Sequence, residues 1–146
     1  MLLGDFGLET RAMQVGCGEE HLVVLDTRGN VWTAGDATHH ALGFGDCEKD
    51  EESPVQLTCL DNITHIAVGQ TCSVALEKSG AMYTWGTLSD LDPIPLPEKM
   101  KQNLQNERIV YIAAGRQHCA AITEEGLLYT WGENGHVSIQ SDAGAM

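Results

Sequence analysis

In three places, residue types that bind metal ions stand close together in the sequence. The candidate groups are Asp36 with His39 and His40, Cys17 with His21, and His118 with Cys119. A structural zinc site takes four ligands, which usually come as pairs a few residues apart. None of the candidate groups has that paired spacing, so we expect no metal site.

Motifs for nucleophilic or phosphate chemistry do not occur in the sequence. A phosphate-binding loop needs clustered glycines followed by a lysine, and a serine nucleophile elbow needs Gly-x-Ser-x-Gly; the chain has neither. Carboxylates such as Glu124 and Glu125 stand at a turn signal between two apolar runs and do not converge on a cleft. We therefore expect a protein that is not an enzyme and that needs no cofactor.

The histidines belong to a larger pattern, a hairpin that is repeated three times. Its glycines recur at constant spacing as Gly18, Gly29 and Gly35, as Gly69, Gly80 and Gly86, and as Gly115, Gly126 and Gly132. His21 and His118 lie three residues after the first glycine of their copies, and Cys72 takes that place in the middle copy. Nine glycines in register do not arise by chance, and a period of this size indicates a stacked array of units.

The residues between the glycines predict short strands. These cover 13–17, 22–26 and 31–34 in the first copy, 54–57, 63–68, 72–76 and 82–85 in the second, and 109–113, 118–123 and 127–131 in the third. Units of four short strands with glycine at the turns are typical of propeller blades. Trp85 and Trp131 end the last strand of their copies and are predicted to pack between blades. The predicted fold is all-β, a partial β-propeller of about three four-stranded blades.

The segments outside the hairpins complete the predicted organisation. We expect one domain over 1–146, with repeats at 13–52, 53–92 and 93–140 and with 1–12 as the tail of a preceding repeat. The acidic run 46–52 is predicted to be solvated. In the connector 87–106, Pro93, Pro95 and Pro97 favour extended backbone, and 99–107 is a possible helical turn. Residues 133–146 are polar and predict a loop or a fraying tail.

Charge and cysteine content restrict the partners. The 146 residues include 8 basic and 21 acidic ones, which gives a net charge of −13. This opposes binding to nucleic acid or anionic lipid and suits a protein partner with a basic surface. The five cysteines are an odd number without a Cys-x-x-Cys pair, which indicates free, buried thiols in a cytoplasmic or nuclear compartment. No signal peptide and no run of about 20 apolar residues is found, so membrane insertion is not expected.

The repeated pattern resembles the repeats of the regulator of chromosome condensation family. The motif is Gly-x-x-His, five small apolar residues, a glycine turn, and then aromatic-Thr-Trp-Gly; residues 112–118 and 129–135 match it best. The resemblance covers 13–135. It implies a closed propeller of about seven four-stranded blades, of which this chain holds about three. The chain would then be a piece of a longer propeller, or an arc that is completed by itself or by another protein.

The resemblance also implies which residues would bind. The founding member of the family exchanges nucleotide on a small GTPase, and histidines of the Gly-x-x-His type take part. Carried over, His21 and His118 would face a GTPase. We also expect their loop neighbours Arg116, Glu19 and Glu20 to contact a partner. The alternative is that His21 and His118 are structural and bond the backbone at each blade. We expect a non-catalytic interaction or scaffold module; the alternatives are a nucleotide exchange factor or a fragment of one, and a structural subunit of a larger assembly.

Overall fold

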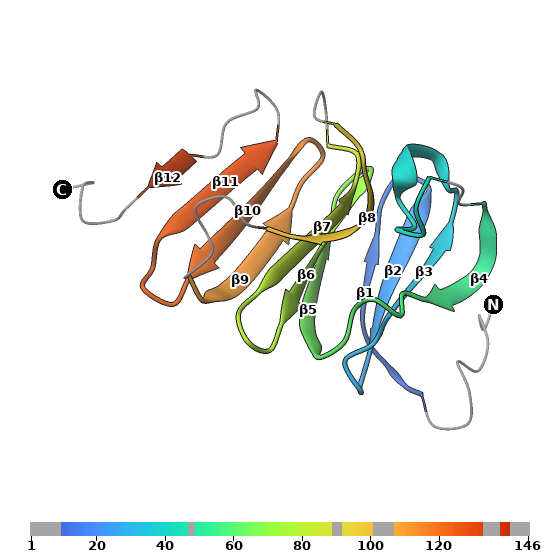
Figure 1. Cartoon of the computed structure of the whole chain (residues 1–146), viewed down its shortest axis with the longest axis horizontal. Helices are drawn as coiled ribbons and strands as arrows, with labels where there is room; N and C mark the ends of the chain where they lie inside the picture. The colour runs from blue at the N-terminus through green and yellow to red at the C-terminus, as the bar shows by residue number, and fades with distance from the viewer. Residues whose placement is uncertain (1–9, 47–48, 89–91, 101–106, 133–137, 141–146) are drawn as a thin grey trace.

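The chain forms three four-stranded antiparallel sheets that stand side by side as the blades of a partial propeller (Figure 1). The computed structural model describes residues 10–46, 49–88, 92–100, 107–132 and 138–140, the last of these by backbone alone. In that part of the chain the regular elements are strands and one short 3₁₀ turn. The fold is thus all-β, as the repeats predicted.

Each blade is a meander in which consecutive strands pair with one another. The first blade contains β1 (Ala12–Cys17), β2 (His21–Asp26), β3 (Val31–Gly35) and β4 (Glu51–Gln56), with the 3₁₀ turn η1 (Thr38–His40) between β3 and β4. The second contains β5 (Ile63–Val68), β6 (Cys72–Glu77), β7 (Met82–Gly86) and β8 (Ile94–Lys99). The third contains β9 (Ile109–Ala114), β10 (His118–Thr123), β11 (Leu128–Gly132) and β12 (Ser138–Gln140).

The glycines determine where the chain turns. Gly29, Gly80 and Gly126 follow the second strand of each blade with φ of 86°, 93° and 89°, a region in which only glycine is unstrained. Their N–H groups donate to the carbonyl oxygens of Asp26, Glu77 and Thr123 at 3.1, 2.8 and 2.9 Å. The hairpin turn predicted at the third of these glycines is therefore confirmed.

Neighbouring blades pack through two apolar clusters. Between the first and second blades lie Val23, Leu25, Val31, Leu57, Leu60, Ile63, Ile66, Ala75 and Trp85. Between the second and third lie Cys72, Val74, Leu76, Met82, Leu88, Ile109, Ile112, Cys119, Ala121, Tyr129 and Trp131. Trp85 and Trp131 are 0% and 7% exposed, so their predicted packing between blades is confirmed.

The long loop after β3 fastens the first blade to the second. The indole Nε1–H of Trp85 donates to the carbonyl oxygen of Ala41 at 3.0 Å, and the Thr87 hydroxyl donates to the carbonyl oxygen of His39 at 2.7 Å. The N–H of Gly45 donates to the carbonyl oxygen of Pro95 at 3.0 Å. In the acidic run that follows, the described members are exposed except Glu51, which is half-buried, and this fits the predicted solvation.

The outer strands differ from what the sequence indicated. The segment around Pro54 was expected to open the second unit, but β4 pairs with β3 and closes the first blade. In the proline-containing connector, residues 94–99 form β8 on β7, and within the expected tail β12 pairs with β11. These strands are at blade edges, where proline is tolerated and local pattern is weak. The possible helical turn begins in strand at Lys99, and 101–106 lie outside the described residues.

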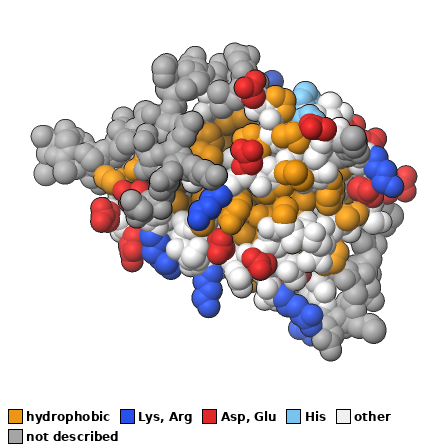
Figure 2. Space-filling model, in the orientation of Figure 1, with side chains coloured by type: hydrophobic (Ala, Val, Ile, Leu, Met, Phe, Trp, Pro, Cys, Tyr) orange, Lys and Arg blue, Asp and Glu red, His pale blue; other side chains and the backbone are white. Residues whose placement is uncertain are grey.

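The surface of the molecule carries both thiols and apolar side chains. Buried thiols were predicted, and Cys72 and Cys119 are buried, but Cys17 and Cys59 are exposed. The end blades expose large apolar side chains, Met13 and Val15 in β1 and Tyr111 in β9, at 56%, 62% and 62%. Figure 2 shows hydrophobic side chains as a band across one face, with charged ones around it. The described part of the chain contains no helix that could span a membrane.

Candidate functional site: a polar rim across three blades

Three equivalent loops form one rim of the arc. They join β1 to β2, β5 to β6 and β9 to β10 and begin at Gly18, Gly69 and Gly115. Each glycine donates its N–H to the carbonyl oxygen of the residue three positions later, at 2.8 Å in all three loops. Because the three turns are closed in the same way, their second and third residues lie at the same end of each blade. Glu19, Glu20 and Arg116 are exposed there, and Gln70, Thr71 and Gln117 are half-buried.

The glycines that end β3, β7 and β11 let the backbone approach these loops. Gly35, Gly86 and Gly132 have φ of 116°, 95° and 133°. A Cβ at any of them would collide with the carbonyl oxygen of the residue just before the Gly-x-x-His position in its own blade. Only glycine therefore allows the third strand to end directly against the rim loop, and this close approach holds the loop in place.

Side chains of the rim loops form a hydrogen-bonded chain across all three blades. Gln70, in the middle loop, donates from its Nε2 to the Glu19 carboxylate at 2.7 Å. Its Oε1 accepts from Arg116 Nε at 3.0 Å and from Gln117 Nε2 at 3.2 Å. The Glu19 backbone N–H also donates to the Gln70 carbonyl oxygen at 2.9 Å. We call the residues Glu19, Glu20, Gln70, Arg116 and Gln117 the rim.

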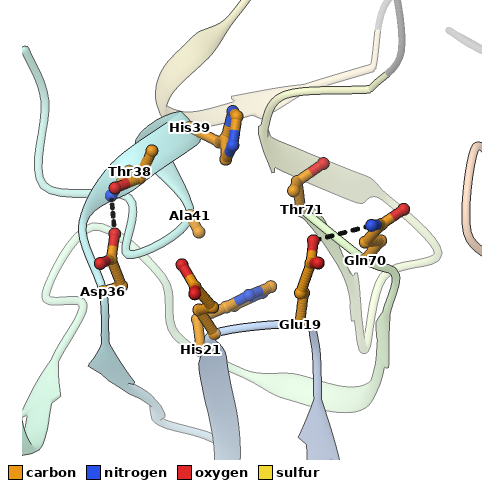
Figure 3. A pocket seen from close by; sticks show the side chains of 9 residues that line it. Glu19, His21, Asp36, Thr38, His39, Ala41, Gln70 and Thr71 are labelled. Atoms are coloured by element: carbon orange, nitrogen blue, oxygen red, sulfur yellow. Dashed lines mark hydrogen bonds between the residues drawn. The ribbon is translucent and has the colours of Figure 1, made fainter.

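A shallow pocket lies beside the rim between the first two blades (Figure 3). Asp36 and Glu19 flank it from opposite sides, and His21, His39 and Thr71 also line it. Its volume of about 30 Å³ has room for one or two water molecules, far less than the several hundred Å³ of a small-molecule site. Hydrogen bonds from Thr38 lower the pKa of the Asp36 carboxyl, so this side of the pocket is negatively charged.

His21 is positioned to join two blades. Its side chain is 5% exposed, and its Nε2 lies 3.1 Å from the hydroxyl oxygen of Ser73 on β6. Burial lowers the pKa of His21 to about 4, so the imidazole is neutral at physiological pH. The contact is thus structural, but it goes to a side chain of the next blade and not to the backbone that the structural alternative named. Binding of His21 to a partner stays a prediction.

The other predicted binding residues are accessible. His118, Arg116, Glu19 and Glu20 are exposed, and Arg116 and Glu19 are brought into the same chain of hydrogen bonds. Sequence reasoning missed Gln70 and Gln117, which join the blades, although they occupy the same loop positions as the predicted residues. Within the described ranges, no group of three or more His, Cys, Asp or Glu side chains is arranged to hold a metal ion.

Comparisons with known proteins identify the repeat. The profile of the Regulator of chromosome condensation (RCC1) repeat matches residues 28–76, and a second profile of that description matches residues 109–136. Together they cover more than half of the chain.

Individual relatives agree with the profiles. The chain is 36% identical over 85 residues to "E3 ubiquitin-protein ligase MYCBP2" of Danio rerio, which is 58% of this chain and 2% of that protein. It is 27% identical over 97 residues to the "Regulator of chromosome condensation" of Homo sapiens, 61% of this chain and 23% of that protein. The chain thus spans less than a quarter of the length of these curated relatives.

A solved structure gives the same result for the fold. The crystal structure of Prp20p from Saccharomyces cerevisiae superposes with a TM-score of 0.70 and 25% identity, over 86% of this chain and 32% of that one. It is described together with the binding of Prp20p to Gsp1p and histones. The two profile matches agree with the glycine-bounded blades and with their packing. This chain therefore belongs to the regulator of chromosome condensation (RCC1) repeat family.

Proposed function

We propose that this chain is a non-catalytic interaction module that binds a protein partner through its rim. The hydrogen-bonded chain from Glu19 through Gln70 to Arg116 carries the proposal. Glu19 and Arg116 are exposed, and Gln70 is half-buried between them. Polar side chains that already hold one another in place lose little conformational entropy on binding, so such a surface is preorganised for a partner. The neighbouring pocket holds no more than one or two water molecules, so the proposal rests on the rim and not on this pocket.

The charge of the chain indicates the kind of partner. The net charge is −13, and Glu19, Glu20 and Asp36 place carboxylates on or beside the rim. A basic protein surface would meet a complementary potential there, which speeds encounter and disfavours acidic partners. We place this encounter in the cytoplasm or nucleus, where the free thiols would remain reduced.

The experiment begins with mild affinity purification of the full chain from its own cells and mass spectrometry of the proteins that accompany it. Binding of the identified partner is then measured with two charge reversals. Glu20→Lys alters the rim. Glu125→Lys makes the same change in the turn between β10 and β11, at the end of the third blade away from the rim. We expect at least a tenfold loss of affinity for the first variant only; equal effects of the two would contradict a rim site.

A second candidate function is nucleotide exchange on a small GTPase. Two observations favour it: the similarity to Prp20p, described with its binding to Gsp1p, and the exposure of His118 on the Gly-x-x-His loop. The test is release of a fluorescent guanine nucleotide from the GTPase with and without the chain. Accelerated release that is lost in His118→Ala supports exchange, while rim-dependent binding without acceleration supports the interaction module.

A third candidate is a structural subunit of a larger assembly. Met13, Val15 and Tyr111 on the end blades are more than half exposed, and exposed apolar faces of this kind mark places where a neighbour packs. In this case the chain by itself would self-associate. It would become monodisperse only together with the partner that covers its end blades, which size-exclusion chromatography with light scattering would detect.

A further inference from the structure

Two cysteine side chains meet in the interface between the second and third blades. Cys72 begins β6, Cys119 is the second residue of β10, and their Sγ atoms are 3.7 Å apart. The two residues are 2% and 1% exposed and belong to the apolar cluster between these blades. They are separated by 47 positions in the sequence, so the stacking of the blades creates this contact.

The same two positions also meet between the first and second blades. There they are His21 and Ser73, whose Nε2 and Oγ atoms lie 3.1 Å apart. The residue at the Gly-x-x-His position of one blade thus reaches the second residue of the corresponding strand in the next blade. These two positions hold a polar pair between the first and second blades and two thiols between the second and third.

The thiols lie in a closely packed part of the interface. Gly69 stands next to Cys72, and a Cβ added there would lie 2.6 Å from the carbonyl oxygen of Gly115 and 2.9 Å from the Cys72 sulfur, so the absence of a side chain at Gly69 lets the third blade approach Cys72. A disulfide needs the sulfur atoms to approach by roughly 1.7 Å, to the S–S bond length of about 2.0 Å. Rotation of the two side chains toward one another shortens this distance.

We propose that Cys72 and Cys119 are a disulfide site that cross-links the second and third blades when the chain meets a peroxide. The cross-link would fix the rim loop that carries Gln70 relative to the loop that carries Arg116 and Gln117. The proposal concerns the folded chain alone and does not depend on which partner the rim binds.

The two thiols have different roles in this reaction. Both cannot ionise at this separation, and the hydrogen bond between them lowers the pKa of Cys72 and raises the pKa of Cys119, which burial raises further. The Cys72 thiolate attacks one oxygen of the peroxide; an S–O bond forms, the O–O bond breaks, and hydroxide leaves and takes up a proton. Cys119 then attacks the Cys72 sulfur, the S–S bond forms, and water leaves with the Cys119 proton. Overall two thiols lose two electrons and two protons, and hydrogen peroxide becomes two waters.

The experiment uses the full chain in which Cys17, Cys47 and Cys59 are replaced by serine, so that only the proposed pair can react. It is treated with hydrogen peroxide, unfolded in the presence of an alkylating reagent, and examined by intact mass and peptide mapping. We expect a loss of two hydrogens, one peptide that joins Cys72 to Cys119, and an unfolding midpoint raised by roughly 10 °C because the bond closes a long loop. Dithiothreitol should reverse all three changes.

The matched variant is Cys119→Ser in the same background. Serine already occupies the equivalent position as Ser73, so the fold should be retained, and neither the mass loss nor the shift of the unfolding midpoint should occur. The proposal is overturned if both thiols of the parent chain are still alkylated after peroxide treatment, or if Cys72 is recovered as sulfinic acid instead of a disulfide. Peptide mapping of the unsubstituted chain after peroxide treatment tests the proposal without any variant, because it shows whether Cys72 is linked to Cys119.

Discussion

His21 on β2 places its Nε2 atom 3.1 Å from the hydroxyl oxygen of Ser73 on β6, inside the interface between the first two blades. The contact is buried, and burial lowers the pKa of the imidazole to about 4. Between about pH 4 and pH 6.5 the histidine is thus neutral in the folded chain, whereas it would be charged in an unfolded one. The stability of the blade interface is consequently coupled to pH.

The first prediction concerns this coupling. Below pH 6.5 the unfolded chain binds a proton at His21, whereas the folded chain binds it only near pH 4. The free energy of unfolding therefore falls as the pH is lowered between these values. The loss amounts to at most about 3 kcal/mol. Urea denaturation of the chain and of His21→Gln across pH 4 to 7 measures it. The variant keeps a hydrogen-bonding group near Ser73 but does not titrate, so its stability should depend less on pH; identical slopes would refute the assignment.

The second prediction compares two glycines of the third blade. Gly132 has φ of 133°, and a Cβ there would collide with the carbonyl oxygen of Gln117 and the Cα of His118, whereas Gly126 has φ of 89° and open space around it. Gly126→Val should destabilise the chain by about 1–2 kcal/mol through backbone strain alone. Gly132→Ala should cost about 3 kcal/mol or more, since strain and a backbone collision add. Thermal unfolding ranks the two, and an unchanged midpoint for the valine variant would contradict the register of the repeats.

The third prediction concerns the loop that joins the first two blades. Trp85→Phe removes the indole N–H that donates to the carbonyl oxygen of Ala41 and leaves a cavity in a fully buried site. We expect a loss of about 2–3 kcal/mol and faster trypsin cleavage after Lys49, because the loop loses one of its anchors. If cleavage accelerates only in proportion to global unfolding, the indole does not hold the loop locally.

The fourth prediction uses two exposed arginines that both bridge the second and third blades. Arg116 donates a hydrogen bond to Gln70 on the rim. Arg108 donates to the carbonyl oxygens of Ser79 and Lys78 at the other end of the blades. Replacing either by alanine should change stability by only about 0.5 kcal/mol. Only Arg116→Ala should weaken partner binding, measured by titration calorimetry. Loss of binding in both variants would indicate that the partner does not recognise the rim.

The sequence predicts local structure better than contacts between blades. The repeated glycines locate the hairpins correctly because each glycine has a local conformational reason, as Gly126 shows. By contrast, β4 follows a long loop and was assigned to the wrong blade, since only the folded sheet decides which strand it pairs with. The burial of His21 and the contact of Cys72 with Cys119 depend on how blades stack, and no local pattern reports that.

The rim was predicted only in part for a related reason. Glu19 and Arg116 were identified because they adjoin the histidines of the repeat. Gln70, which bonds both of them, adjoins Cys72 in the middle copy and therefore did not match the motif. Comparing the three copies position by position, rather than by their histidines, would have found it.

The stacking of the blades also determines how this molecule comes apart. Among the described strands, those that pack most across blades are β1 and β2 with β5, and β5 and β6 with β9. In this part of the chain the middle blade is therefore packed on both sides and each outer blade on one. Such a chain is a short linear array whose stability is a sum over neighbouring pairs. Opening should start at an outer blade and proceed inward, and amide hydrogens of β5 and β6 should be the last to exchange with solvent.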